Sequence, residues 1–182
     1  MHLRIKDNQA AQKWTRSELL LRVLWALIHP LFRYSPRIFW IWRVWILRIF
    51  GASIGSGVHI YPTARIMLPW NLAIGSQASI GDGANLYNLG LISIGPAATI
   101  SQGAHLCAGT HDYLRGDMPL LKLPIVIGEG AWICADSFIG PGVTIGDYAI
   151  VGARAVAMRN VADWTIAVGN PARVIKSRPK PI

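Results

Sequence analysis

The chain has 182 residues, of which 52% are hydrophobic and 15% charged, and its formal net charge is +9. This length suits one principal domain plus an appendage and is enough for a real core. The only two cysteines, Cys107 and Cys134, are too few for a disulfide framework. The composition therefore excludes a small disulfide-stabilised fold and favours a reducing cytoplasm.

Residues 1–50 carry most of the positive charge. They contain nine Lys or Arg against two acidic residues, and five of the eight tryptophans, whereas residues 51–182 contain nine basic against seven acidic residues. Arginines interrupt the apolar stretches, so neither stretch predicts a membrane span, and no small-residue cleavage site marks a signal peptide. The pattern is typical of an interfacial anchor on anionic lipid. The few polar side chains among these charges argue against nucleic acid.

The second apolar stretch of this segment has helix boundary signals. Ser35 is a suitable N-cap, Pro36 suits the first helical position, and Gly51 suits the end of a helix. We therefore expect one helix over residues 36–50. A basic helical extension over residues 1–50 can act as a cap on the following domain, as a membrane-surface anchor, or as both.

From Ile54 almost to the C-terminus, an aliphatic anchor recurs every six residues with a small residue four places later. The anchors are Ile54, Ile60, Ile66, Ile74, Ile80, Leu86, Ile94, Ile100, Leu106, Leu121, Ile127, Ile133, Ile139, Ile145 and Val151. A six-residue unit is too short for a helix or a hairpin and can bury its anchor only by stacking on its neighbours, which predicts a parallel β-helix with three faces per coil. Glycines directly after many anchors are expected to turn the backbone at positive φ.

Breaks in the repeat indicate where the coils and a loop lie. Two-residue insertions follow three hexads twice, after Ile66 and after Leu86, and predict coils over residues 54–73, 74–93, 94–120, 121–138 and 139–156. The pattern disappears from Asp112 to Leu120, and Leu121 is in phase with the later anchors. Residues 112–120 are therefore expected to project as a loop, which is where function usually resides on a rigid scaffold.

These residues resemble a known superfamily. The hexads that begin at Ile139 and Ile145, and the ending Val-Gly-Asn-Pro-Ala-Arg from Val168, are similar to those of the hexapeptide-repeat acyltransferases, most closely the colanic-acid-type polysaccharide O-acetyltransferases. The resemblance implies an all-β fold, a single-stranded left-handed parallel β-helix with an N-terminal helical extension. It places the acyltransferase domain at residues 51–177, followed by a tail at 178–182, and it implies a homotrimer.

The same resemblance implies transfer of an acetyl group from acetyl-coenzyme A to a sugar hydroxyl in exopolysaccharide biosynthesis, without a metal. Such a reaction needs a base for the acceptor hydroxyl, and His111, beside the expected loop, is the candidate because an imidazole titrates near neutral pH. Asn85 matches the family's acceptor-binding asparagine, and Asn88 is a close competitor. His105 is the reserve histidine, one coil above Asn85.

The family also implies residues that bind the donor. Trp132 matches a position that packs on the pantetheine arm, and Ala135 and Ala153 match small positions along its slot. Arg159 and Arg173 match basic positions near the nucleotide phosphates and have the charge for them. The Met158-Arg159 pair stands where Thr-Lys is frequent in the family, so the contact from Arg159 departs from the family pattern.

Asn85 and His111 end their hexads at different corners of the prism, roughly 16 Å apart along an extended face. If both serve one site, they come from adjacent subunits, which agrees with the implied trimer. Residues 1–50 also replace the helical region with which soluble-sugar acetyltransferases bind their acceptor. We therefore expect a glycan or lipid-linked oligosaccharide acceptor, met at the inner face of the cytoplasmic membrane.

Two alternatives stay open from the sequence. A carbonic anhydrase of the same prism fold needs three histidines on zinc, and no pair among His59, His105 and His111 is about one coil apart. A non-catalytic β-helix scaffold would keep the repeat without the chemistry. The presence of His111, the expected loop and Trp132 favours the enzyme.

Overall fold

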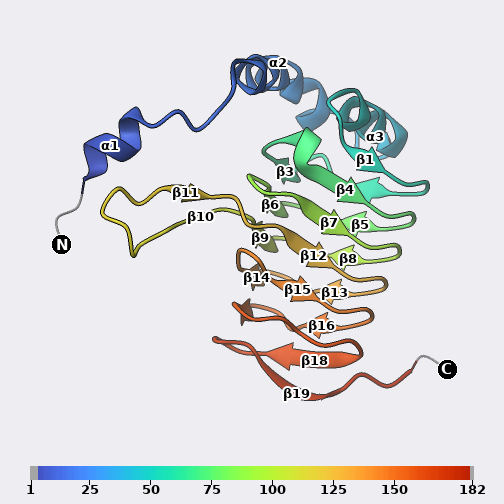
Figure 1. Cartoon of the computed structure of the whole chain (residues 1–182). Helices are drawn as coiled ribbons and strands as arrows, with labels where there is room; N and C mark the ends of the chain where they lie inside the picture. Colours follow the sequence, from blue (N-terminus) through green and yellow to red (C-terminus); the bar gives the residue numbers. More distant parts are fainter. Residues whose placement is uncertain (1–3, 181–182) are drawn as a thin grey trace.

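Three parallel sheets form the faces of a left-handed parallel β-helix, with its axis vertical in Figure 1. The computed structural model describes residues 4–180. The first sheet comprises β1 (Ser53–Ile54), β4 (Leu72–Ile74), β7 (Ile92–Ile94), β12 (Ile125–Ile127) and β15 (Thr144–Ile145). The second comprises β2 (His59–Ile60), β5 (Ser79–Ile80), β8 (Thr99–Ile100), β13 (Trp132–Ile133), β16 (Ile150–Val151), β18 (Thr165–Val168) and the antiparallel β19 (Arg173–Ser177). The third comprises β3 (Arg65–Ile66), β6 (Asn85–Tyr87), β9 (His105–Cys107), β14 (Phe138–Ile139) and β17 (Val156–Ala157). The predicted fold class is confirmed.

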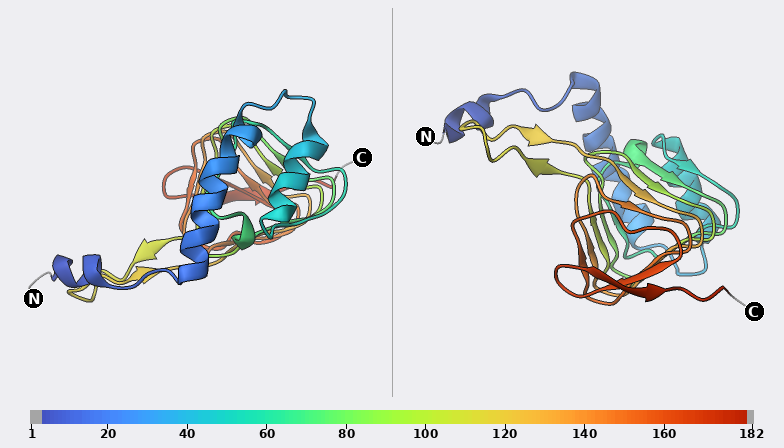
Figure 2. Two further views of the ribbon diagram at one scale, coloured as in Figure 1. Left: turned by 90° about the horizontal axis from the view of Figure 1, so that it is seen from above. Right: turned by 60° about the horizontal axis from the view of Figure 1, so that its bottom comes forward.

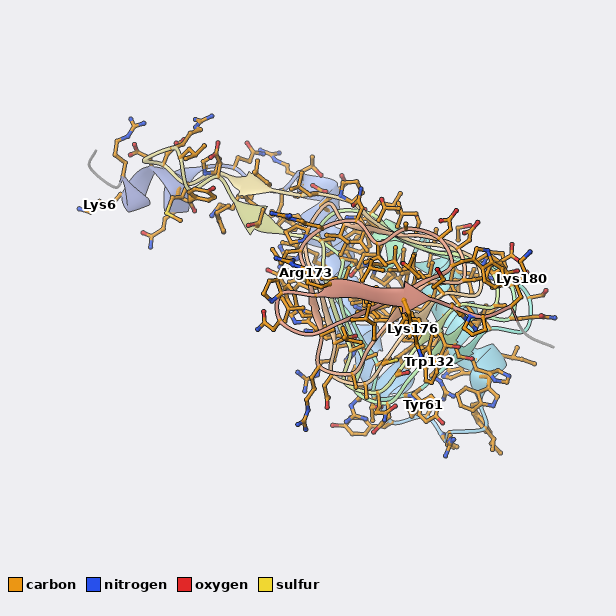
Figure 3. The ribbon with its side chains drawn as sticks, turned by 90° about the horizontal axis from the view of Figure 1, so that it is seen from below. Lys6, Tyr61, Trp132, Arg173, Lys176 and Lys180 are labelled. Atoms are coloured by element: carbon orange, nitrogen blue, oxygen red, sulfur yellow. The ribbon has the colours of Figure 1, made fainter. Side chains whose placement is uncertain are left out.

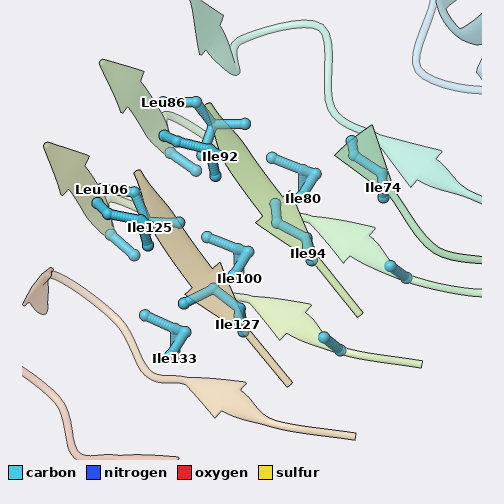
Figure 4. Packing of buried hydrophobic residues seen from close by; sticks show 14 of the residues in the cluster. Ile74, Ile80, Leu86, Ile92, Ile94, Ile100, Leu106, Ile125, Ile127 and Ile133 are labelled. Atoms are coloured by element: carbon cyan, nitrogen blue, oxygen red, sulfur yellow. The ribbon is translucent and has the colours of Figure 1, made fainter. Parts of the chain in front are cut away.

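The anchors stack in columns inside the prism (Figure 4). Ile60 is in register with Ile80, and Ile80 with Ile100, so each anchor covers the one in the coil before it. These three side chains are fully buried, as is the small residue Ala84 at a corner. The residue before each anchor points outward because side chains alternate along a strand. Every coil therefore presents fixed outward positions on each face.

The coil boundaries after residue 120 differ from the sequence prediction. Leu121 belongs to β11 (Leu120–Leu121), which pairs antiparallel with β10 (Thr110–His111), and its register partner is Thr110. The prism resumes at Ile125, which is in register with Ile92 of the first sheet. Leu121 is therefore not an anchor, and the fourth and fifth coils start one hexad later than predicted. Leu121 is six residues before Ile127 by coincidence, and the sequence alone could not distinguish it from an anchor.

The glycines after the anchors also serve a different purpose from the predicted one. Gly75 and Gly95 are not among the residues with positive φ. A Cβ at Gly75 would lie 2.4 Å from the backbone nitrogen of Pro96, and a Cβ at Gly95 would lie 2.6 Å from that of Glu129. These glycines are needed because successive turns pack closely. Positive φ occurs two residues later in the turn instead, for example at Gln77 and Ala97.

Two helices lie across the N-terminal end of the prism, as the view from above shows (Figure 2). They are α2 (Arg16–Arg33) and α3 (Trp40–Ile49). Thr15 and Glu18 form a capping box that begins α2. The predicted helix over 36–50 is too long, because α3 begins only at Trp40. Ser35 does not cap it, since its hydroxyl donates to the carbonyl of Phe32 and accepts from Arg43.

The helices supply hydrogen-bond donors to the backbone carbonyls at the open end of the β-helix. In later coils, the carbonyl of each anchor accepts from the residue after the anchor one coil earlier, as Gly55 N–H donates to Ile74. The first coil has no coil before it. Its three anchor carbonyls accept instead from one helix side chain on each face: Ile54 from Arg48 Nε (3.1 Å), Ile60 from Arg43 Nε (2.6 Å) and Ile66 from Trp25 Nε1 (3.0 Å). The α2–α3 pair is therefore a structural cap.

A two-stranded arm leaves the prism after β9 and reaches the first helix, α1 (Ile5–Ala10) (Figure 1). The arm includes β10 and β11, so it is longer than the predicted loop 112–120. Arg4 N–H donates to the carbonyl of Gly116 at 2.7 Å, which ties the N-terminal segment to the arm. Lys122, at the base of the arm, lies 4.1 Å from the ring centroid of Trp14.

Candidate active site

His111 lies on β10 of the arm, with its side chain exposed. Its Nδ1 is 2.7 Å from the carbonyl oxygen of Met118. A carbonyl only accepts hydrogen bonds, so Nδ1 carries a proton, and in the neutral imidazole the lone pair is then on Nε2. This is the tautomer that a general base needs. Met118 itself has a φ of 42°, so its backbone takes an uncommon turn at this contact.

Asn85 lies at an outward position of the third sheet and is half-buried. It is in register with Arg65 on one side and with His105 on the other, which confirms that His105 stacks one coil above it. The His105 ring packs edge-on against Phe138 and Tyr87, and its Nε2 is buried without a hydrogen-bond partner. Burial lowers the pKa of His105, so this imidazole stays neutral near pH 7.

The structure contradicts the prediction that Asn88 binds the acceptor. It is fully buried, and its Oδ1 accepts from the backbone N–H groups of Met67 and Leu68, both at 3.0 Å. Its Nδ2 donates to the carbonyl of Leu68 at 2.6 Å. The amide is used by the turn of the neighbouring coil and is closed to a ligand. A buried asparagine at a corner and a half-buried one on a strand look alike in sequence.

Four of the candidate donor-binding residues lie on the second sheet or at the corner where it meets the third sheet. We call this corner the second–third edge. Trp132 projects outward from the second sheet, 45% exposed, with Nε1 donating to Ser101 Oγ at 2.8 Å (Figure 3). Ala135 and Ala153 lie in successive turns at this edge, where Arg154 N–H donates to the carbonyl of Ala135. Arg173 begins β19, in register with the last residue of β18. These four residues therefore lie on the second sheet or at its edge with the third sheet.

The fifth donor-binding candidate lies at a different edge of the prism. Arg159 follows β17, in the turn from the third sheet back to the first, and is exposed. The arm that carries His111 leaves the prism at this same third–first edge, two coils earlier. Asn85 directly follows the corner residue Ala84, so it sits with the second–third group. The candidate residues therefore divide between two edges of one prism.

Within residues 4–180, no group of three or more His, Cys, Asp or Glu is arranged to hold a metal ion. The three prism histidines lie on separate elements: His59 on the second sheet, His105 on the third, and His111 on the arm. His59 stacks on Trp40, with ring centroids 4.8 Å apart. Among the described residues, these histidines therefore form no three-histidine site of the kind that the carbonic anhydrase alternative needs.

Sequence reasoning missed two features of the site. The Met118 carbonyl that orients His111 also accepts a hydrogen bond from Asn8 of α1. A backbone acceptor leaves no trace in residue type, so no sequence signal could have found it. Arg65 is different, because residues 65, 85 and 105 are each 20 apart. Counting the two-residue insertions places them in one outward row, and this neighbour of Asn85 could have been predicted.

Comparison with known proteins decides the family. The model of the bacterial transferase hexapeptide (six repeats) matches residues 124–156. The chain is 43% identical over 158 residues to the colanic acid biosynthesis acetyltransferase WcaF assigned in Escherichia coli, covering 87% of each chain. The chain belongs to the hexapeptide-repeat acetyltransferases. It is also 32% identical over 124 residues to the galactoside O-acetyltransferase of E. coli, covering 68% of this chain and 56% of that protein.

Solved structures of this acetyltransferase family share the fold. A maltose O-acetyltransferase from Clostridium difficile superposes with a TM-score of 0.82 at 26% identity, covering 91% of this chain and 90% of that chain. A hexapeptide-repeat acetyltransferase of Vibrio cholerae, solved with acetyl coenzyme A, gives a TM-score of 0.83 at 23% identity, covering 93% of both chains. The chain therefore shares the fold of these acetyltransferases over most of its length.

Proposed function

We propose that this acetyltransferase moves an acetyl group from acetyl-coenzyme A to a sugar hydroxyl during exopolysaccharide assembly. The observation that carries the proposal is His111, whose protonated Nδ1 is held by the Met118 carbonyl while Nε2 stays free. The similarity to proteins named for colanic acid biosynthesis and for galactoside O-acetylation supports a glycan acceptor. A scaffold without chemistry would not need an imidazole fixed in one tautomer.

In the proposed reaction, Nε2 of His111 takes the proton of the acceptor hydroxyl as its oxygen attacks the thioester carbonyl carbon. The tetrahedral intermediate then collapses, the carbon–sulfur bond breaks, and the imidazolium returns the proton to the departing thiolate. Asn85 hydrogen-bonds the acceptor sugar and orients the hydroxyl. The proton taken from the hydroxyl ends on the thiol of coenzyme A, so the reaction needs no further reactant.

The donor is proposed to lie along the second–third edge. The indole of Trp132 packs on the pantetheine arm, and Ala135 and Ala153 leave room for this thin chain. Arg173, at the end of the path, has the charge for the nucleotide phosphates. Arg159 lies at the third–first edge, so it would reach the same coenzyme only from a neighbouring subunit.

We propose a homotrimer because the candidate site residues are divided between two edges of the prism. His111 and Arg159 belong to the third–first edge, and Asn85 and Trp132 belong to the second–third edge or the sheet that leads to it. Packing prisms side by side around a three-fold axis places one edge of each against the other edge of the next. We propose that each active site forms between two subunits in this way.

Association with a membrane surface is proposed for the cap. No helix among the described residues is long and apolar enough to cross a membrane. The outer side of α2 and α3 nevertheless exposes large apolar side chains, among them Leu20, Leu24, Leu27, Leu31, Ile41, Trp45 and Ile49. Arginines flank them, and Glu18 is the only acidic residue of the two helices. An apolar face with a basic border suits anionic lipid, which would present a lipid-linked acceptor.

Vesicle binding tests this part. Ile41→Glu, at a side chain that is 86% exposed, should abolish sedimentation with phosphatidylglycerol vesicles. Val126→Glu is the control, because Val126 is 42% exposed on the prism, away from the cap. If wild-type protein stays in solution with anionic vesicles, the membrane association is wrong.

Release of coenzyme A from acetyl-coenzyme A, measured with a panel of glycan acceptors, tests the reaction. His111→Ala should lower kcat/KM by roughly 10²- to 10⁴-fold, the usual value of a general base. Since His111 is exposed, the fold should persist, which circular dichroism checks. An unchanged rate in His111→Ala with an active wild type would remove His111 as the base and point to His105.

A further inference from the structure

A cavity beside Asn85 is lined by basic side chains. Its volume is about 390 Å³, and it lies between the C-terminal half of α2 and the start of the third sheet. It is lined by His29, Arg33, Ala64, Arg65, Ile66, Met67, Asn85 and Tyr87. Two guanidinium groups and an imidazole thus line the cavity, and no acidic side chain does.

The geometry directs these groups toward one another. His29 and Arg33 are four residues apart on α2, so they share one side of the helix. Arg65 and Asn85 are register partners on β3 and β6, and both point outward from the third sheet. Neighbouring strands lie about 4.8 Å apart. A ligand held by Arg65 would therefore touch Asn85 as well.

The two arginines of the cavity also differ from others in the described part of the chain. Arg43 and Arg48 donate to backbone carbonyls of the cap, and Arg115 and Arg154 form ion pairs with aspartates. Within residues 4–180, neither Arg33 nor Arg65 forms an ion pair with an acidic side chain. Their positive charge in a concave site is not neutralised by the protein itself.

We propose that this cavity binds a phosphate or diphosphate group attached to the acceptor sugar, next to the hydroxyl-orienting Asn85. Guanidinium groups bind phosphate oxygens in a bidentate way, and two of them match the charge of a diphosphate. This inference rests on the proposed function and names its acceptor class, a glycosyl phosphate or diphosphate.

The position of the cavity relates the phosphate to the cap. Arg33 faces the cavity, and Leu27 and Leu31 are exposed on α2, 69% and 54%. A helix with its side chains is about 10 Å across. A diphosphate in the cavity would therefore lie roughly one helix diameter from the apolar face of the cap. This distance suits a sugar joined through diphosphate to a lipid, and a nucleotide-linked sugar is the other source of the same group.

Calorimetry with inorganic pyrophosphate tests the subsite without any turnover. Saturating coenzyme A is added so that the nucleotide-phosphate site is filled. Arg33→Gln/Arg65→Gln should weaken pyrophosphate binding by at least about 10-fold, whereas Arg16→Gln, at the far end of α2, should leave it unchanged. The substituted side chains are exposed, so the fold should persist. Equal affinity in the double variant and the wild type would overturn the proposal.

Competition identifies the source. Displacement of pyrophosphate by farnesyl diphosphate-linked glucose would support a lipid-linked acceptor, and displacement by uridine diphosphate glucose alone would support a nucleotide-linked one. Displacement by glucuronate but by neither diphosphate would overturn the phosphate assignment. The subsite and the reaction can fail separately. Acetyl transfer that depends on His111, without pyrophosphate binding, would remove only the subsite, and pyrophosphate binding without acetyl transfer would remove only the proposed function.

Discussion

The prism and the non-repeating parts are held together in different ways. In the prism, each aliphatic anchor covers the anchor of the coil before it, and each backbone ladder repeats the one before it. In the cap, single side chains replace the backbone donors of a preceding coil. Trp25, Arg43 and Arg48 each donate a hydrogen bond to the anchor carbonyl of one face. The arm depends on a few contacts with α1 and Trp14. Repetition supplies the frame, whereas the proposed base His111 lies in the arm, which does not repeat.

The cap should contain the most sensitive single position. Arg43 is fully buried, and its guanidinium donates to Ile60 (2.6 Å), Ser35 (2.8 Å) and Arg37 (2.6 Å). Arg43→Ala leaves these acceptors without donors and should lower the free energy of unfolding by about 4 kcal/mol. Urea denaturation measures this, with Arg16→Ala as the control. A loss below about 0.5 kcal/mol would show that the cap does not depend on this side chain.

In the prism, an anchor deletion should cost somewhat less than that. Ile100 is fully buried in the centre of the second sheet. Ile100→Ala should lower the free energy of unfolding by about 3 kcal/mol, because stacked neighbours can only partly close the cavity. Val126→Ala, at an exposed side chain of the first sheet, should change it by less than about 0.5 kcal/mol. Similar losses in both variants would contradict the inward and outward positions described for the coils.

The arm should affect catalysis more than stability. Asn8 and His111 donate to the same carbonyl of Met118, so Asn8 is a positioning residue for the base. Asn8→Ala should lower kcat roughly 5- to 10-fold and shift the pH profile of kcat/KM, with little change in the urea midpoint. Gln12→Ala, in the same segment, is the matched control. Unchanged kcat and pH profile in Asn8→Ala would contradict this role.

The smallest effect should be a pH dependence of stability. Burial lowers the pKa of His105, and burial together with nearby Arg33 lowers the pKa of His29. Both therefore bind fewer protons in the folded state than in the unfolded state below about pH 6.5. Their contribution is fully present above that pH and is lost as pH falls. The urea midpoint should decrease from pH 7.5 to 5.5, less steeply in His105→Phe. A midpoint that rises on acidification would contradict it.

The sequence predicts the prism better than the site. The six-residue period is set by the stacking itself, so the three faces and the buried anchors follow from spacing. Leu121 misled the count because an aliphatic residue in the arm happens to keep the phase. The prediction that Asn88 binds the acceptor failed for another reason. Whether an asparagine at a corner is buried depends on which backbone groups nearby need a hydrogen-bond partner. The orientation of His111 depends on a carbonyl, which residue identity does not encode.

Mixing two inactive variants tests most directly whether the site forms between subunits. In a trimer of His111→Ala and Asn85→Ala chains, an intact His111 edge meets an intact Asn85 edge at one interface of every mixed assembly. Refolding the two variants together at equal amounts should restore roughly a quarter of the wild-type acetyl transfer, with the trimer mass confirmed by light scattering. No recovery in mixed trimers would contradict the account and place both residues in a site within one chain.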